Sequence, residues 1–203
     1  MKKILLLATM LFVASMPAYA QDEYPKFELA GMFNLLRADI DMLGNETMYG
    51  YGVGAQFNAT KRFGLVAEWS AAHGSSGPTE IFQSGTTYEI PLVDTRVQTI
   101  LLGPRMSFRS QAFKTLGAEM SFTVFGHCMA GAGTNKIDYF INSYTRWQFA
   151  FAVGGGVDVN VGKRFAIRVA QIDWLPILSK LNLQGADDLF SNWRYQGGCV
   201  FKF

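Results

Sequence analysis

Charged residues are scarce in this 203-residue chain: Asp, Glu, Lys and Arg make up 17% of it, against roughly 25% in ordinary soluble domains. This scarcity argues against a disordered chain and against a soluble domain with a charged surface. Proline is also scarce, with 6 residues beside 21 glycines, which argues against a Pro/Gly-rich linker protein. The length fits a single domain.

The first 20 residues contain no acidic residue. Lys2 and Lys3 precede an apolar stretch over 4–13, and Ala18-Tyr19-Ala20 supplies a small-residue cleavage pattern. These features predict a bacterial signal peptide over 1–20, Sec-type export and a mature domain over 21–203. A transmembrane anchor is the alternative, but the apolar stretch is too short to span a bilayer comfortably.

The predicted mature chain lacks an excess of either charge. Without Lys2 and Lys3, its basic and acidic residues are equal in number. A nucleic-acid-binding protein usually carries a basic patch or stripe, so we expect no nucleic-acid partner. Electrostatic steering of a polyanion is unlikely to be the function for the same reason.

Long apolar runs are missing as well, since no segment after Ala20 approaches 18 consecutive apolar residues. This excludes a helical membrane protein. The chain is nevertheless 49% hydrophobic and 14% aromatic. An exported, aromatic-rich and glycine-rich chain without apolar helices favours strands, either in a soluble sandwich or in a membrane barrel.

A period of two runs through most of the chain, with bulky apolar residues alternating with small or polar ones, as in half-buried strands. The regular segments are 27–36, 49–58, 63–72, 148–159, 165–170 and 193–203. Two less regular segments, 95–108 and 116–132, bring the predicted number of strands to eight. Pro104 lies in the first of these two and predicts a bulge or a break in the ladder.

The predicted connections alternate between short and long. Those at 58–61, 109–115 and 161–163 are short, and those at 38–46, 73–94, 133–146 and 175–191 are long. This layout is typical of an outer-membrane barrel, with short periplasmic turns and long outer loops. Apolar faces would then contact outer-membrane lipid, and small or polar faces would fill a lumen that is narrow at eight strands. Ordinary aromatic strands of a sandwich remain the alternative.

The mature chain resembles the small OmpA-like outer-membrane proteins, the group called the outer membrane protein beta-barrel domain. The resemblance covers nearly all of 21–203 and rests on short sequences listed here: Leu102-Gly103-Pro104-Arg105, Gly154-Gly155-Gly156-Val157-Asp158, Lys163-Arg164-Phe165-Ala166-Ile167-Arg168, Asp173-Trp174-Leu175-Pro176 and Val200-Phe201-Lys202-Phe203. It implies an all-β, eight-stranded antiparallel up-and-down transmembrane barrel with periplasmic termini and without a shared catalytic site.

Charged residues on the inward faces predict a network in the lumen. Counting from the turns places Arg105 opposite Glu119, with Glu68 at a similar height, so we expect Arg105 to contact one or both acids. Asp158 is expected diagonal to Arg168, and Glu28 and Lys202 should lie near the inner ends of the first and last strands. A gated pore or proton path would use such charges. A sealed lumen is favoured, because eight strands leave no aqueous channel.

The final strand carries Tyr195, Phe201 and Phe203 on one face. A last strand that ends in phenylalanine resembles the signal read by the barrel-assembly machinery, which we therefore expect as a partner. An unpaired strand of this kind is available for β-augmentation.

Other chemistry has little support in the sequence. Outer-membrane lipid deacylases of this size use a His–Ser pair, but no Ser follows His127 at the needed spacing, and His73 is expected to be a solvated residue at the start of a long loop. We therefore expect no enzyme and no catalytic residue. Cys128 and Cys199 fall on strands that are not neighbours, so we expect two free thiols. No metal or cofactor site is expected. The predicted function is that of a small structural outer-membrane protein with loops 73–94 and 175–191 exposed to external ligands. A narrow pore and a lipid-modifying enzyme are the alternatives.

Overall fold

The computed structural model describes residues 24–40, 44–76, 79–83, 86–90, 93–110, 113–115, 118–139, 142–179 and 188–203, at some strand ends by the backbone alone. The predicted signal peptide lies outside these residues. The described part of the chain is built from strands, and it contains no helix long and apolar enough to cross a membrane.

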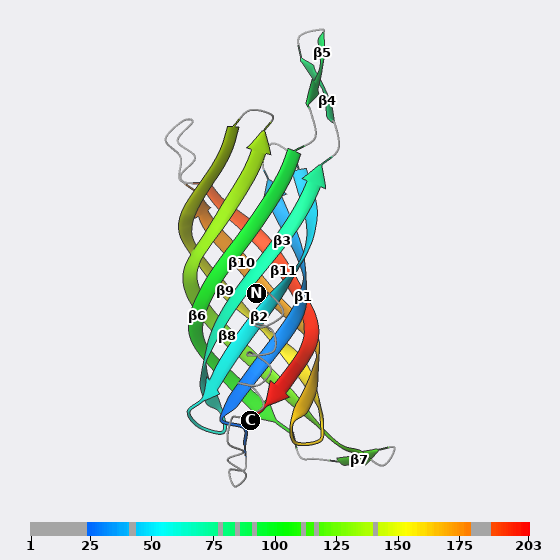
Figure 1. The fold of residues 1–203 in the computed structure, drawn as a ribbon, viewed down its shortest axis with the longest axis vertical. Coiled ribbons are helices and arrows are strands. Elements are labelled where there is room, and N and C mark those ends of the chain that lie inside the picture. The colour runs from blue at the N-terminus through cyan, green and yellow to red at the C-terminus, as the bar shows by residue number, and fades with distance from the viewer. Residues whose placement is uncertain are drawn as a thin grey trace, which may run out of the picture.

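Eight long antiparallel strands form a closed barrel (Figure 1). They are β1 (Phe27–Ile40), β2 (Gly44–Asn58), β3 (Phe63–Ser76), β6 (Val93–Arg109), β8 (Ala118–Tyr139), β9 (Asn142–Val161), β10 (Phe165–Ser179) and β11 (Asp188–Lys202). Each strand pairs with the next barrel strand along the chain, and β11 returns to pair with β1, where Glu28 lies opposite Lys202. Closure removes the free edges of the sheet, so the predicted fold class is confirmed.

Three short strands lie outside the barrel wall. Figure 1 shows β4 (Thr79–Gln83) and β5 (Thr86–Ile90) as a hairpin beyond one end of the barrel. The third, β7 (Phe113–Thr115), pairs with β8 at the opposite end, where the chain also ends at Phe203. We call these two ends the loop end and the turn end.

The strands extend further toward the loop end than predicted. The segment 133–146, expected as a long loop, is mostly a hairpin in which β8 and β9 remain paired from Gly133–Gln148 to Tyr139–Asn142. The expected loop 73–94 likewise contains the end of β3, the β4–β5 hairpin and the start of β6. Polar residues interrupt the alternation of apolar and polar side chains but do not prevent backbone pairing. Strand ends predicted from composition were therefore placed too early.

The two faces of the barrel differ as the period of two predicts. Large apolar side chains point outward and are exposed, among them Phe33, Tyr51, Leu102, Phe149 and Val169, which is 61% exposed. The inward face carries the buried polar and charged residues. Large apolar surfaces of this kind are stable when they contact another apolar phase.

Pro104 does not produce a bulge. Pairing between β6 and β8 runs to Leu102–Ala130, resumes at Arg105–His127 and keeps the same register. Proline lacks the N–H that a ladder hydrogen bond needs, which accounts for the interrupted pairing. Because the register is unchanged, Arg105 stays on the inward face.

A bulge occurs instead in β10. Arg168 lies opposite Asp158 on β9, but Ala170 lies opposite Val157, so β10 has one extra residue at this point. The same shift appears against β11, between Arg168–Gly198 and Gln171–Gln196. The extra residue keeps Arg168, Gln171 and Asp173 all pointing into the lumen, which strict alternation would not allow.

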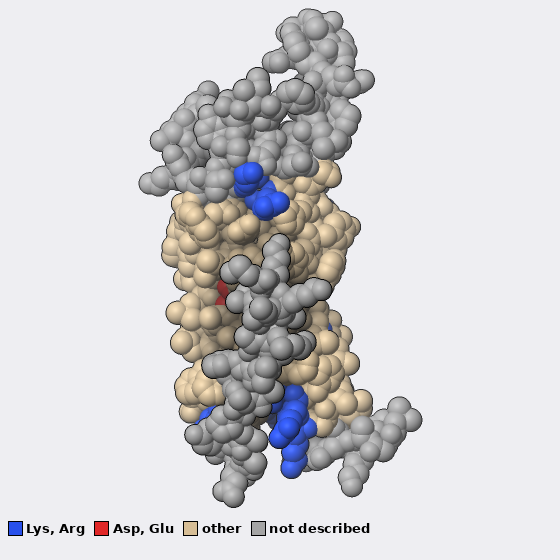
Figure 2. Space-filling model, viewed as in Figure 1, with Lys and Arg blue, Asp and Glu red and all other residues tan. Residues whose placement is uncertain are grey.

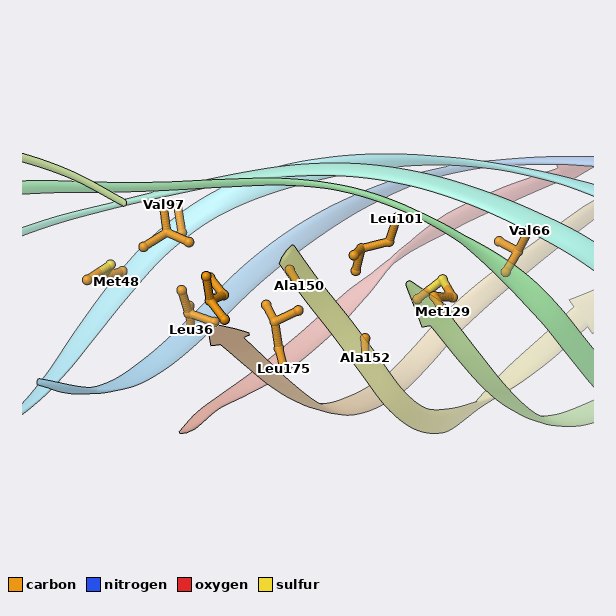
Figure 3. Close-up of a cluster of buried hydrophobic side chains, with 11 residues drawn as sticks. Leu36, Met48, Val66, Val97, Leu101, Met129, Ala150, Ala152 and Leu175 are labelled. Atoms are coloured by element: carbon orange, nitrogen blue, oxygen red, sulfur yellow. The ribbon is translucent and has the colours of Figure 1, made fainter. Parts of the chain in front are cut away.

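The lumen contains an apolar cluster in addition to its polar residues. Figure 3 shows these side chains meeting inside the barrel. The cluster consists of Leu36, Met48, Val66, Ala72, Val97, Leu101, Met129, Ala150, Ala152, Leu175 and Ile177. Leu36 and Met48 are opposite each other near the loop end of β1 and β2. Apolar side chains therefore fill the lumen among the charged ones: Leu36 lies opposite Arg194, and Val66 lines the same small cavity as Glu68 and Arg105.

Candidate functional site

The charged lumen is the candidate site, and most of the residues predicted for it are there. Glu28, Glu68, Arg105, Asp158, Arg168 and Lys202 are all buried and on inward faces. The exception is Glu119, whose side chain lies outside the described residues. Its backbone pairs with Lys114 of β7, while Arg105 pairs with His127. The predicted Arg105–Glu119 register is therefore wrong, because β8 begins further along the turn than the count from Ala112 assumed.

Arg105 is held by neutral partners. One terminal nitrogen, Nη1, donates to Gln56 Oε1 at 2.8 Å, and Nη2 lies 3.4 Å from His127 Nδ1. The guanidinium carbon is 4.2 Å from the centre of the Phe125 ring, and that of Arg168 is 4.5 Å from the same centre. An aromatic face stabilises cations in a desolvated place, which lets two arginines share one ring.

Glu68 pairs with Arg194 and not with Arg105. Arg194 Nη1 lies 2.7 Å from Glu68 Oε1, and Arg194 Nη2 lies 2.6 Å from Asp173 Oδ2. Arg194 thus bridges two carboxylates from β3 and β10. A buried arginine between two acids is strongly held, because each charge removed from water requires its partner.

His127 and Asp173 meet across an intervening strand. His127 on β8 and Asp173 on β10 both lie opposite Gly154 of β9, and His127 Nε2 is 2.8 Å from Asp173 Oδ1. A Cβ added at Gly154 would lie 2.2 Å from Asp173 Oδ1. The glycine therefore provides the space for this contact. With the carboxylate accepting from Nε2–H, Nδ1 is free to accept from Arg105.

Asp158 and Arg168 form the clearest predicted pair. They are directly opposite in register, not diagonal, and the bond is bidentate, with Nε–Oδ1 at 2.8 Å and Nη2–Oδ2 at 3.1 Å. Arg168 Nη1 also donates to Gln171 Oε1 at 2.9 Å, across the bulge. Bidentate geometry is the strong form of an arginine–carboxylate contact.

The turn end of the lumen is closed by a second group of polar contacts. Glu28 Oε1 accepts from Asn58 Nδ2 at 2.8 Å and from Arg109 Nη2 at 3.0 Å. Lys202 Nζ donates a hydrogen bond to Asn160 Oδ1, and Asn160 Nδ2 donates to Thr123 Oγ1 at 2.9 Å. The predicted placement of Glu28 and Lys202 at the inner ends of the first and last strands is confirmed by their register.

Charge in the described lumen is balanced. The buried acids are Glu28, Glu68, Asp158 and Asp173, and the buried bases are Arg105, Arg168, Arg194 and Lys202. A small cavity of about 10 Å³ lies between Glu68, Arg105 and Arg168, comparable to the room that one water needs. The interior described here is thus packed with paired side chains.

The network also contains residues that were not predicted for it, among them Gln171, Asp173 and Arg194. Arg194 lies on the inward face of the alternation that begins at Trp193, so the pattern alone could have identified it. Gln171 and Asp173 become visible only if the change of phase after Val169 is read as a bulge: outward apolar residues are odd up to Val169 and even from Ile172.

Other chemistry-bearing residues lie apart from the lumen network. His73 is on the outward face, where its Nδ1 accepts from Arg96 Nε at 3.1 Å. Cys128 and Cys199 are free and exposed, as predicted. Among the described residues no group of His, Cys, Asp and Glu is arranged to hold a metal ion.

The aromatic residues of the last strand lie along the seam of the barrel, where β11 pairs with β1. Tyr195 and Phe201 point outward, and Phe201 packs edge-on against Phe165 of β10 with ring centres 5.6 Å apart. Phe203 accepts from Lys26 N at 2.8 Å and donates to Phe27 O at 2.8 Å. In the closed barrel Tyr195 and Phe201 are paired with both β1 and β10. Their predicted recognition by the assembly machinery therefore concerns the unfolded chain.

Comparison with known proteins agrees with this geometry. The structure is similar to that of Neisserial surface protein A, with a TM-score of 0.58 and 10% identity over 88% of this chain and 97% of that one. It is also similar to Ail, the attachment invasion locus protein of Yersinia pestis, with a TM-score of 0.53 and 16% identity over 89% and 99%. These likenesses show the shared barrel fold.

No curated protein matches the chain significantly in sequence. A family model does match, and it covers residues 5–196, nearly the whole chain. The family is the one whose members fold as closed barrels of the bacterial outer membrane, as the register and the two faces of this barrel also indicate. The chain belongs to the outer membrane protein beta-barrel domain family.

Proposed function

We propose that this protein is a small structural barrel of the outer membrane, exported by a Sec-type signal, with a sealed lumen and with loops that bind ligands or surfaces outside the cell. The observation that carries the proposal is the filling of the lumen. The balanced ion pairs around Arg194 and the apolar cluster that includes Met129 together fill the described interior. Side chains packed in this way leave no continuous aqueous path.

The loop end supplies the binding surface in this proposal. The β4–β5 hairpin, within loop 73–94, forms a two-stranded sheet of its own and projects beyond the barrel (Figure 1). A hairpin that pairs with no barrel strand offers backbone edges to an extended partner. The second predicted loop, 175–191, begins within β10, which runs to Ser179, and ends within β11, which starts at Asp188; residues 180–187 lie outside the described residues.

A conductance measurement tests the sealed lumen against the narrow pore. We expect the purified protein, refolded into planar lipid bilayers, to give no channel steps under conditions in which a general porin gives them. Steady unitary steps from the refolded protein would overturn the sealed lumen and favour the pore.

Protease treatment of intact cells tests the orientation separately. We expect proteinase K to cut within 79–90, and trypsin to leave the turn-end sites at Lys61 and Arg62 uncut until the outer membrane is permeabilised. Cleavage at the turn end in intact cells would reverse the proposed orientation without bearing on the lumen.

The lipid-modifying enzyme has weaker support. The His127 side chain is wholly buried in the lumen against Asp173, away from lipid. His73 faces outward with Ser75 two residues later, but its Nδ1 is occupied by Arg96, and Nε2 then carries the proton, so neither ring nitrogen is available as a base. We expect identical lipid A mass spectra from cells with and without the protein. Loss of an acyl chain that depends on Ser75 would show an enzyme.

A further inference from the structure

A row of polar and basic side chains crosses four strands on the outward face near the loop end. Tyr49 of β2 lies opposite His73 of β3, His73 opposite Arg96 of β6, and Arg96 opposite Lys136 of β8. Figure 2 shows basic side chains gathered at this level, above a broad band almost without charge on the same face. The row therefore lies where the apolar wall gives way to the loops.

Part of this row borders a groove of about 490 Å³. Its outward-facing lining is Thr47, Tyr49, His73, Ser75 and Arg96, which we call the basic groove. Every one of these side chains offers an N–H or O–H donor, and no carboxylate is among the described lining residues. A concave surface that presents donors and a cation is suited to an anion.

The hydrogen bond between Arg96 and His73 prepares the groove for that anion. Arg96 Nε donates to His73 Nδ1 at 3.1 Å, which fixes the plane of the guanidinium. The two terminal nitrogens of Arg96 have no partner within the described ranges. They can form the parallel pair of bonds that arginine makes with phosphate. The neutral His73 ring keeps its proton on Nε2 and adds a further donor.

The apolar surface next to the groove indicates which kind of molecule carries the anionic group. Tyr51, Trp69 and Ile100 follow the row on the same outward face, and Ile100 is 52% exposed. A ligand that reaches both surfaces has a phosphorylated headgroup joined to acyl chains. An arginine here also costs little, because the penalty for a lipid-facing charge falls steeply from the bilayer midplane to the interface.

We propose that the basic groove binds the phosphate groups of a phosphorylated glycolipid of the outer leaflet, with Arg96 as the main contact. The inference goes beyond the proposed function and shares with it only the assumption that the loop end faces outward. Lys136, beside Arg96, adds positive charge to the row. Basic pockets next to apolar membrane surfaces are a general means of holding anionic lipid headgroups.

Binding of defined lipids tests the proposal. The refolded protein is placed in phosphatidylcholine nanodiscs that contain either bisphosphorylated lipid A or chemically dephosphorylated lipid A, and bound lipid is measured by native mass spectrometry after release into detergent. We expect the parent to retain the phosphorylated form, and Arg96→Gln to lower its affinity by about tenfold, the effect of losing one charge-assisted pair of bonds. Arg62→Gln at the turn end is the matched control and should bind as the parent does.

Each result decides the matter. Equal retention of the dephosphorylated lipid, or an Arg96→Gln variant that binds as tightly as the parent, would overturn the proposal. Competition by millimolar inorganic phosphate that fully displaces the lipid would assign the groove to free phosphate. Folding of each variant is checked by heat modifiability on gels, and conductance is unaffected by this outcome, so the lumen is judged independently.

Discussion

His127 Nε2 and Asp173 Oδ1 lie 2.8 Å apart although their strands, β8 and β10, are not neighbours. The strand between them contributes Gly154 at this level, and its missing side chain leaves the line between the two residues open. The contact joins Arg105 on one side to Arg194 on the other, so it links the two halves of the charge network.

Gly154→Ala should destabilise the barrel. The new Cβ would meet Asp173 Oδ1 and the Ile172 carbonyl, each at 2.2 Å, so the strands must shift. Overpacking of this kind costs about 1–3 kcal/mol. Urea unfolding in lipid vesicles, followed by tryptophan fluorescence, measures the loss. Gly126→Ala is the control, because its Cβ would meet nothing closer than 3.7 Å; equal midpoints for the two variants would contradict the prediction.

Arg194→Met should be the most damaging single change in the lumen. It leaves the carboxylates of Glu68 and Asp173 buried without their shared cation, and removing one partner of a buried pair costs about 3–5 kcal/mol. Adding Glu68→Gln should recover part of the loss, since one of the stranded charges disappears. The same unfolding assay checks both variants, with Arg62→Met on the exposed turn expected to change stability by under about 1 kcal/mol. A double variant no better than the single one would show that lost packing, and not lost charge, is the cause.

Deleting Ala170 should be tolerated. The bulge gives β10 one residue more than its neighbours, so removing it restores regular alternation and keeps Gln171 and Asp173 inside. Deleting Val157, which lies opposite in β9 where no residue is spare, would turn every later side chain of that strand to the other face. The gel shift between heated and unheated samples reports which variant closes. Failure of both, or closure of both, would contradict this account of the bulge.

Removing Phe203, or replacing it with Lys, should impair assembly more than Lys163→Ala does. Phe203 exchanges backbone hydrogen bonds with Phe27 and Lys26 at the seam, and its ring continues the aromatic face of Tyr195 and Phe201. Lys163 lies in an exposed turn. The fraction of heat-modifiable protein in outer membranes measures assembly in cells. Refolding of the same variants in vesicles separates loss of recognition by the assembly machinery from loss of stability.

The barrel was predictable from the sequence because each strand has one apolar and one small or polar face. Phe33, Tyr51 and Phe149 follow that rule, and all point outward. The ends of the strands were less predictable. Beyond Ala132, backbone pairing continues through polar residues such as Asn135 and Lys136, which composition alone assigns to a loop.

The sequence predicted which charged residues lie in the lumen better than it predicted which of them contact each other. Asp158 and Arg168 flank a three-residue turn at Gly162, so counting from that turn brought them close together. The count failed for Arg105, because the longer turn before β8 includes a short strand that displaces the register. Glu68 and Arg194 come from distant parts of the chain, and only the curvature of the closed barrel brings them together.

The seam between β1 and β11 determines when the interior becomes stable. Asn34 and Gln196, which are hydrogen-bonded to each other, are separated by 162 positions in the chain, whereas the other barrel strands pair with their sequence neighbours. Strand β11 also carries Arg194, so a sheet without β11 holds Glu68 and Asp173 with no cation between them. A carboxylate in that state keeps its hydration water, and the water must leave as the seam closes. Closure of the barrel wall and neutralisation of its interior charges therefore occur together. A barrel that lacks β11 keeps a hydrated interior.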